Sequence, residues 1–207
     1  MSLWEDRILP RLVELSLNDK VTGRWRSRVC AGVSGEVLEL GFGSGPNLRH
    51  YGTGVDRVLA VEPADLAWHR ARPAVERFGR PVERIGLDGA RVDLPDASVD
   101  AVVTTYTMCT IPDLGAALAQ ARRVLRPGGA LHFVEHGLSP DPGVATWQHR
   151  LQPMWGRVAG GCHLDRDIAA LVTAAGFTLD ETESRYAEKA APARPFQWIT
   201  IGRATPS

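Results

Sequence analysis

The chain has 207 residues, of which 44% are apolar and 23% are charged, and its 24 Lys and Arg balance its 24 Asp and Glu. This length fits one domain with a sizeable core. The balanced charge, with no dense cationic run, argues against a nucleic-acid partner, because phosphate backbones are bound by an excess of Lys and Arg on one face.

The N-terminal sequence lacks the basic-then-apolar order of a signal peptide, and no apolar run reaches the length of about 18 residues that spans a bilayer. We therefore expect a cytoplasmic protein with no integral membrane association. Residues 3–17 are at most amphipathic and are interrupted by Pro10. Their apolar face comprises Trp4, Ile8, Leu12 and Leu15. We interpret residues 1–34 as a helical lid, with membrane-surface binding as the alternative.

From residue 36 onward, short β-rich runs alternate with helical patterns, which predicts βαβ units and a mostly parallel sheet. The expected strands are 36–40, 57–61, 82–87, 99–105, 130–135, 177–186 and 196–201. Helices are expected over 114–125, which stops at the Arg-Pro-Gly-Gly of 126–129, and over 165–175, with Asp165 as N-cap. The predicted fold class is α/β: a Rossmann-like, seven-stranded, mostly parallel sheet with helices on both faces, spanning 35–207.

Residues 137–162 break the alternation of strands and helices. They hold two Trp and three Pro in no clear period, over a length that exceeds an ordinary connection. We expect an irregular segment that covers the substrate.

Residues 36–47 read EVLELGFGSGPN, an apolar strand that runs into glycines at alternate positions. Gly41, Gly43 and Gly45 let the backbone turn sharply and approach a ligand that side chains would keep away. A dinucleotide-binding turn requires G-x-G-x-x-G, and its third glycine is replaced here by Pro46. This replacement disfavours an NAD-dependent dehydrogenase. Pro46 and Asn47 are expected to open a helix with unpaired N–H groups near the turn.

An acidic residue two positions before a G-x-G-x-G turn resembles motif I of class I S-adenosylmethionine-dependent methyltransferases. The resemblance implies the class I methyltransferase architecture and S-adenosylmethionine as cofactor, released as S-adenosylhomocysteine. It also implies that Glu39 orients the turn near the methionine end of the cofactor. A carboxylate inside an apolar strand needs such a partner.

The second strand ends at Glu62, about 20 residues past the turn, where a carboxylate can accept both ribose hydroxyls. The alternative is a residue that complements a helix dipole, with Pro63 in the first turn. Asp88 and Gly89 resemble the third strand end of the same family, which implies contacts to the adenine; the alternative is a plain turn pair. The expected cofactor-binding residues are Glu39, Gly41, Gly43, Gly45, Asn47, Glu62, Pro63, Asp88, Gly89 and Thr105.

Later segments resemble a narrower group, the animal microsomal alkyl-thiol methyltransferases and their bacterial relatives. The segments are 107–112 (TMCTIP), 134–136 (VEH), 147–148 (WQ), 153–155 (PMW) and 161–166 (GCHLDR). The resemblance implies methyl transfer to small thiols, including hydrogen sulfide. It departs at the N-terminus, where the animal enzymes carry a hydrophobic membrane anchor that is not seen in this sequence.

Methyl transfer is an in-line displacement that depends mainly on positioning and exclusion of water. His136 and His163 are the candidate bases, since a histidine accepts a proton near neutrality; each has a structural role as its alternative. Trp147 and Trp155 either line the substrate pocket or anchor the cover. Cys162 is placed in the pocket as a small buried side chain, because direct transfer requires no covalent intermediate.

The leading hypothesis is a soluble methyltransferase for a small-molecule acceptor, preferably a thiol, acting as a monomer or homodimer. Quinone or phenol C- or O-methylation and lipid-amine N-methylation are alternatives. A non-catalytic S-adenosylmethionine-binding module is an alternative of another class. No metal is expected, because the three cysteines are far apart in sequence and form no C-x-x-C pair.

Overall fold

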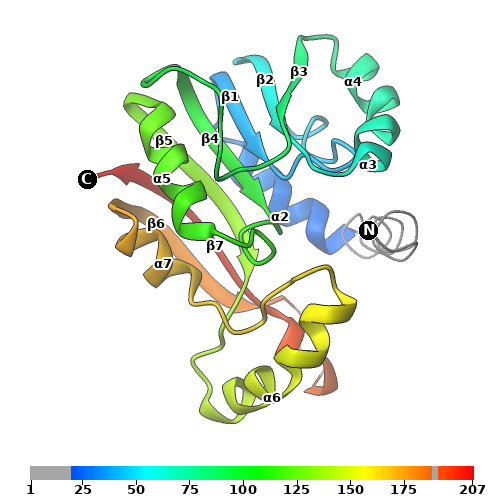
Figure 1. The fold of residues 1–207 in the computed structure, drawn as a ribbon, viewed down its shortest axis with the longest axis vertical. Coiled ribbons are helices and arrows are strands. Elements are labelled where there is room, and N and C mark those ends of the chain that lie inside the picture. Colours follow the sequence, from blue (N-terminus) through cyan, green and yellow to red (C-terminus); the bar gives the residue numbers. More distant parts are fainter. Residues whose placement is uncertain (1–19, 188–190) are drawn as a thin grey trace.

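The computed structural model describes residues 20–187 and 191–207 (Figure 1). The lid helix expected over 3–17 lies outside the described residues. The elements follow the order α2 (Lys20–Cys30), β1 (Gly35–Leu40), β2 (Val55–Val61), α3 (Asp65–Arg70), α4 (Arg72–Phe78), β3 (Val82–Gly86), β4 (Val99–Thr105), α5 (Leu114–Val124), β5 (Leu125–His136), α6 (Pro142–Val158), α7 (Ile168–Ala174), β6 (Phe177–Tyr186), η2 (Ala191–Phe196) and β7 (Trp198–Pro206).

The strands form one seven-stranded sheet in the order β3-β2-β1-β4-β5-β7-β6. The first five strands in this order are parallel, and β7 runs antiparallel to both β5 and β6. The chain therefore leaves β1 toward one side, through β2 and β3, and returns to β4 on the other side. This reversal places the end of β1 at a topological switch point, where ligands bind in open α/β sheets.

Helices cover both faces of the sheet because the central strands are apolar on both sides. In β1, Leu38 and Leu40 face one hydrophobic cluster and Val37 faces the other. The first cluster includes residues of α5 and α7, and the second includes residues of α2 with partners from α3 and α4. Figure 1 shows α5 and α7 in front of the sheet and α2 behind it.

Local sequence explains α5. The carboxylate of Asp113 accepts a hydrogen bond from the N–H of Ala116, which caps the helix N-terminus. The apolar side chains of α5 recur every three or four residues, and each is buried. They are Leu114, Ala117, Leu118, Ala121 and Val124. The spacing of the sequence thus directs one face of α5 onto the sheet.

The predicted fold class is confirmed, and every predicted strand is present. Two expectations about helices are wrong. Residues 44–50 form successive turns instead of a helix opened by Pro46, with Leu48 N bonded to Gly45 O and His50 N to Asn47 O. The helix after the cover is capped by Asp167, whose carboxylate accepts from Ala170 N, and not by Asp165.

The segment expected to be irregular contains the 17-residue helix α6. Asp141 caps it, Pro142 occupies its first turn, and Pro153 lies inside it. Only Val144 and Gln148 of this helix are buried, so its apolar pattern is weak. The helix was not predicted because the segment contains two prolines and its apolar residues show little helical periodicity.

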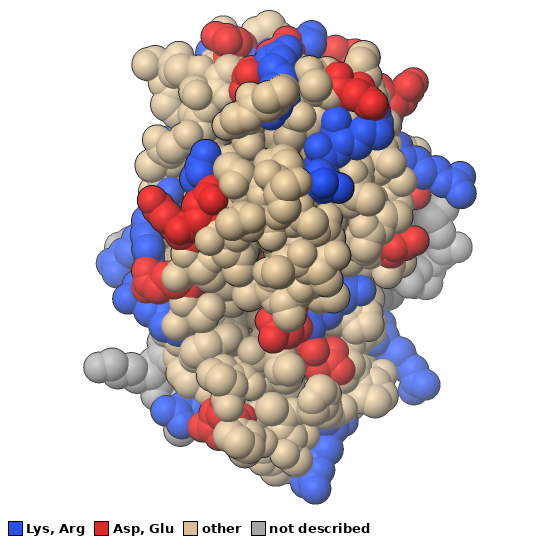
Figure 2. All heavy atoms as spheres, turned by 90° about the vertical axis from the view of Figure 1, so that its left-hand side faces the viewer, with Lys and Arg blue, Asp and Glu red and all other residues tan. Residues whose placement is uncertain are grey.

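Figure 2 shows one face of the molecule, on which Lys and Arg side chains are interspersed with Asp and Glu. Within 20–187 and 191–207, no helix combines the length and the apolar composition that crossing a bilayer requires.

Replacement of Leu118 by Ala tests the packing of α5 on the sheet. The Leu118 side chain is 2% exposed, so we expect the substitution to lower the free energy of unfolding by about 2–5 kcal/mol. Leu87→Ala is the control, because Leu87 is 58% exposed and its truncation should cost at most about 0.5 kcal/mol. Urea denaturation measures both, and equal losses would contradict the assigned packing.

Candidate active site

The glycine turn leaves β1 at the switch point, between β2 and β4. Gly41 has φ of +75°, and a Cβ built there would lie 2.2 Å from Thr107 Oγ1. Both the backbone conformation and the contact therefore require glycine. Thr107 follows β4, so this contact packs the turn directly against the segment that leaves the neighbouring strand.

Gly43 differs from Gly41 because it faces open space. A Cβ built on Gly43 would meet no atom within 4 Å, although its φ of +59° still favours glycine. Its N–H donates a 2.7 Å hydrogen bond to Glu62 Oε2. The backbone at Gly43 is thus held in place while its other side is free for a ligand to approach.

Glu62 follows β2 directly and is 6% exposed. Its other carboxylate oxygen, Oε1, accepts a 2.8 Å hydrogen bond from Ala64 N. Burial raises the pKa of Glu62, opposed by these two backbone hydrogen bonds. Helix α3 begins at Asp65 with Ala64 as its N-cap residue, so Glu62 and Pro63 precede the helix. The alternative that placed Pro63 in the first helical turn is therefore wrong.

Glu39 lies in β1 and is 1% exposed. Its Oε1 accepts from Asn47 Nδ2 at 2.9 Å, and its Oε2 accepts from Tyr51 Oη at 2.6 Å. Burial raises the pKa of Glu39 to about 7, against the hydrogen bonds and the nearby Arg26 guanidinium, which favour the ionised form. The protein itself supplies both hydrogen-bond partners, so Glu39 holds the chain after the turn in place.

Arg26 from α2 completes this buried network. Its Nη1 donates to Asn47 Oδ1 at 2.9 Å and to Thr105 Oγ1, and Asn47 Nδ2 also contacts Thr105 Oγ1 at 3.1 Å. The network thus joins α2, β1, the turn and β4. Glu39, Asn47 and Thr105 were predicted to lie near the cofactor. Arg26 was not predicted, because no sequence spacing relates a helix upstream of β1 to the end of β4.

Asp88 and Gly89 lie in the turn after β3. Asp88 is exposed, and its Oδ1 accepts a 2.9 Å hydrogen bond from Ala90 N, as in the plain turn considered above. A Cβ on Gly89 would lie 3.7 Å from Leu40 Cδ2, so the structure brings this turn beside the end of β1. The turns after β1, β2 and β3 therefore share one edge of the sheet.

His136 ends β5 at the same edge. Its Nε2 lies 3.0 Å from Cys162 Sγ, and its Nδ1 is buried without a hydrogen-bond partner among the described residues. A hydrogen bond with Cys109, together with burial, raises the pKa of the Cys162 thiol. A protonated thiol is a weak nucleophile, which agrees with its expected role as a buried side chain.

The preceding residue, Glu135, is fully buried and links β5 to the segment after β4. Its Oε1 accepts from Thr104 Oγ1 at 2.7 Å and from Thr107 N at 2.9 Å. The same Thr107 packs on Gly41. Glu135 was missed as a candidate site residue, although its position in an apolar strand end repeats the pattern that singled out Glu39.

His163 has other side-chain partners than His136. Its side chain is 42% exposed, and its Nδ1 is 3.3 Å from Gln152 Nε2 and 3.7 Å from Asp165 Oδ1. It borders a depression of about 480 Å³ beside α6. The lining residues are His149, Gln152, Pro153, Gly156, Arg157, Gly161, His163 and Asp165.

The two tryptophans of α6 have different surroundings. Trp155 packs on Phe196 of η2 with ring centroids 4.6 Å apart. Trp147 is 56% exposed, with the Arg150 guanidinium 5.8 Å from its ring centroid. Gln148, which the sequence analysis missed, is 1% exposed and bonds Ser139 N, Gly137 O and Pro195 O at 2.9 Å each. Gln148 and Trp155 therefore anchor α6 to the rest of the protein.

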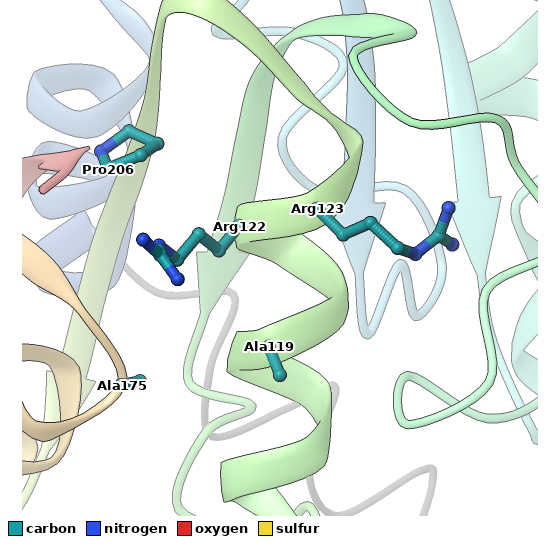
Figure 3. A pocket seen from close by; sticks show the side chains of 5 residues that line it. All are labelled: Ala119, Arg122, Arg123, Ala175 and Pro206. Carbon is teal, nitrogen blue, oxygen red and sulfur yellow. The ribbon is translucent and has the colours of Figure 1, made fainter.

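A second hollow, of about 340 Å³, lies at the opposite edge of the sheet, at the end of α5 that leads into β5. Its lining residues are Ala119, Arg122, Arg123, Ala175 and Pro206. Figure 3 shows Arg122 directed toward Pro206 and Arg123 directed the other way. Arg122 donates to Ser207 O and Arg123 to Val92 O and Leu94 O, so both guanidinium groups hold backbone segments.

Residues 38–133 match a protein family described as a methyltransferase domain. The chain is also 32% identical over 177 residues to thiol S-methyltransferase TMT1B of Rattus norvegicus, which covers 83% of this chain and 69% of the rat protein. The chain belongs to the thiol S-methyltransferase family of S-adenosylmethionine-dependent methyltransferases. The resemblance stated from motif I and the later segments is therefore confirmed.

Solved structures agree on the fold of this methyltransferase. An S-adenosylmethionine-dependent methyltransferase from Mesorhizobium loti matches with a TM-score of 0.64 at 18% identity, covering 91% of this chain and 99% of that one. The cyclase SpnF matches with a TM-score of 0.71, also at 18% identity, over 89% of this chain and 81% of that one. These similarities show a shared architecture, which by itself does not fix an activity.

Replacement of Glu39 by Gln tests the buried carboxyl of the methyltransferase. Its pKa rises from 4.5 to about 7 on folding, so the folded protein retains this proton to higher pH than the unfolded chain. The stability that this proton contributes is complete below about pH 4.5 and is lost as the pH rises to about 7.

The free energy of unfolding of the wild type minus that of Glu39→Gln should therefore fall by roughly 1 kcal/mol per pH unit across this window. Denaturant titrations at several pH values measure the difference. Glu83→Gln, at an exposed position of β3, should leave the slope unchanged. A pH-independent difference for Glu39→Gln would show that the carboxyl titrates normally.

Proposed function

We propose that this protein transfers the methyl group of S-adenosylmethionine to the sulfur of a small thiol. The observation that carries the proposal is the 32% identity to a thiol S-methyltransferase, which covers 83% of this chain and so extends beyond residues 38–133. The geometry at the carboxyl edge of the sheet supports a site for the donor on one side and for the acceptor on the other.

The donor side fits an adenosyl cofactor. The backbone at Gly43 faces open space, and the buried Glu62 carboxylate beside it has acceptor capacity beyond its two backbone hydrogen bonds. Glu62 would accept the ribose hydroxyls. Asp88 and the N–H of Gly89 would contact the adenine, since their turn lies beside the end of β1. Glu39, Asn47 and Thr105 would hold the turn itself.

S-adenosylmethionine supplies a methyl group on a sulfonium, which passes to the acceptor sulfur while the electron pair of the broken bond stays on the departing sulfur. The protein must hold the acceptor in line with the methyl group and exclude water. A thiol titrates near 8.5, so a weak base suffices to deprotonate it near neutral pH.

Of the two predicted bases, we favour His163 as the proton acceptor. Its side chain is partly exposed at the depression beside α6, with the Asp165 carboxylate 3.7 Å from its Nδ1. The Nε2 of His136 lies 3.0 Å from Cys162 Sγ, and its Nδ1 is buried, so neither ring nitrogen is available to the acceptor. The depression then provides the route by which the acceptor reaches the site, and Trp155 holds α6, which forms one wall of it. Trp147 does not line this depression, so it would contact the acceptor only at the exposed surface of α6.

A methyl-acceptor assay tests the proposed function. The measurement is S-adenosylhomocysteine release from S-adenosylmethionine with small thiols, phenols, quinols and amines of similar size. We expect turnover with thiols. Turnover with phenols, quinols or amines but not thiols would contradict the thiol assignment, and cofactor binding without turnover would indicate a non-catalytic binding module.

Glu62→Gln tests the donor side of the proposed site. Loss of the carboxylate should weaken S-adenosylmethionine binding at least tenfold in calorimetry, since charge-assisted hydrogen bonds contribute about 1.5–3 kcal/mol each. Glu83→Gln on the neighbouring strand should bind like the wild type. Unchanged affinity in Glu62→Gln would remove Glu62 from the cofactor site.

His163→Gln tests the base. At pH 7 we expect kcat about 100-fold lower than in the wild type, and the two should converge above about pH 8.5, where the thiol is ionised without help. His149→Gln is the control, because His149 lines the same depression and also contacts Asp165. A loss that persists at high pH, or an equal loss in the control, would contradict the assignment.

A further inference from the structure

Three potential metal-ligand side chains, from segments that lie far apart in the sequence, meet at the carboxyl edge of the sheet. The ligand atoms of Cys109, His136 and Cys162 all lie within 4.8 Å of one another. Cys109 follows β4, His136 ends β5, and Cys162 follows α6. Cys109 is 2% and Cys162 is 7% exposed, so both cysteines are buried, whereas His136 is partly exposed.

Hydrogen bonds fix the segments that carry Cys109 and Cys162 relative to each other. The N–H of His163, next to Cys162, donates to Cys109 O at 2.8 Å. Arg166 holds the other side of this segment through hydrogen bonds from its Nη1 to Met108 O and Ile111 O. Gly160 and Gly161, with φ of +62° and +84°, reverse the chain after α6 and return Cys162 to the sheet. These contacts bring Cys162 beside Cys109 without using either thiol.

The three side chains have few other partners. The Sγ of Cys109 has a 3.5 Å contact with Thr110 Oγ1, and the Sγ of Cys162 lies 3.0 Å from His136 Nε2. The Nδ1 of His136 is buried with no hydrogen-bond partner in the described part of the chain. The imidazole can therefore rotate without losing a hydrogen bond on its Nδ1 side.

We propose that Cys109, His136 and Cys162 bind a zinc ion and leave its fourth coordination position for the sulfur of the acceptor. Two thiolates and one imidazole form a ligand set that zinc prefers, and three protein ligands with one open position characterise catalytic zinc sites. Among the described residues, no fourth His, Cys, Asp or Glu joins the group.

The geometry requires a small adjustment. Tetrahedral coordination with zinc–sulfur bonds of about 2.3 Å and zinc–nitrogen bonds of about 2.0 Å places the nitrogen about 3.5 Å from each sulfur and the two sulfurs about 3.8 Å apart. The 3.0 Å separation between His136 Nε2 and Cys162 Sγ must therefore widen by about half an ångström. Binding also releases the two thiol protons, as it does at any cysteine-ligated zinc.

The position of the group suits the acceptor. Thr107, two residues before Cys109, packs against Gly41 of the glycine turn, and Glu135, next to His136, accepts the N–H of Thr107. The group therefore adjoins the turn on which the donor is expected. On its other side, Gly161 and His163 flank Cys162 and line the depression beside α6.

The role of the open position rests on the proposed function. An acceptor thiol would replace water on the zinc ion and pass its proton to His163, the base favoured above, and its sulfur would remain on the metal as a thiolate. The thiolate sulfur then forms the new bond to the methyl carbon as the methyl–sulfonium bond breaks and its electron pair remains on the donor sulfur. The product thioether is uncharged and a weaker ligand, so water or the next thiol displaces it.

Cobalt(II) titration of the full chain, purified under a non-chelating phosphine reductant, tests the metal site. The wild type should show thiolate-to-cobalt charge-transfer absorption and the visible bands of tetrahedral cobalt, both abolished by one equivalent of zinc. Cys109→Ser and Cys162→Ser should each weaken cobalt binding at least tenfold. Cys30→Ala is the control, because Cys30 is a buried cysteine of α2 outside the group and should bind like the wild type.

Calorimetry with S-adenosylmethionine shows that each variant is folded. Absence of the cobalt bands in the wild type, or their persistence in both serine variants, would overturn the metal site. A Cys109–Cys162 disulfide in the protein kept under reductant, found by mass spectrometry after alkylation, would overturn it as well.

The open position is tested by adding an acceptor thiol to the cobalt form without S-adenosylmethionine. We expect the charge-transfer band to shift with the thiol and not with the corresponding alcohol. An unchanged spectrum in a protein that does methylate the thiol would overturn the zinc-bound thiolate while the proposed function stands. If no thiol is methylated, the proposed function fails, and the cobalt titration still reports on the metal site.

Discussion

The buried hydrogen-bond network around Glu39 connects the parts of this protein on which the donor side depends. A carboxylate in an inner strand of a sheet is costly to bury unless it is hydrogen-bonded. Here Asn47 and Tyr51 supply the hydrogen bonds, and Arg26 supplies a nearby positive charge. The residues belong to α2, β1 and the turns after β1, so the network fixes the path of the chain around the open face of Gly43.

The topology of the sheet explains why the candidate site residues lie at one edge. Parallel strands all end at the same edge, and the reversal between β1 and β4 leaves room there for a ligand. Glu62, Asp88, Thr105 and His136 each follow or end one of these strands. The opposite edge has a hollow too, but its two arginines hold backbone carbonyls and offer no comparable group of acids or thiols.

The donor and acceptor sides are built differently. The donor side depends on short contacts between adjacent turns, such as Gly41 on Thr107 and Gly43 on Glu62. The acceptor side depends on α6, which is held by Gln148 and by the packing of Trp155 on Phe196. Because most of α6 is exposed, this side has fewer buried contacts than the sheet, and elements with few buried contacts open most readily.

The sequence alone determined the strands, the glycine turn and the acids at the strand ends, because each is a local pattern: alternating or continuous apolar residues, glycines where side chains clash, and carboxylates at fixed offsets. The sequence also showed the family resemblance. It did not predict α6, because the prolines and few buried residues of that helix obscure the helical period. It wrongly predicted a helix near residues 44–50, where Pro46 opens turns. Only the tertiary structure decided that Arg26 reaches Asn47 and Thr105, and that Cys109, His136 and Cys162 meet. Such contacts join segments that lie far apart in the chain, and their proximity follows from strand order and from the glycine reversal after α6, which no single stretch of sequence encodes.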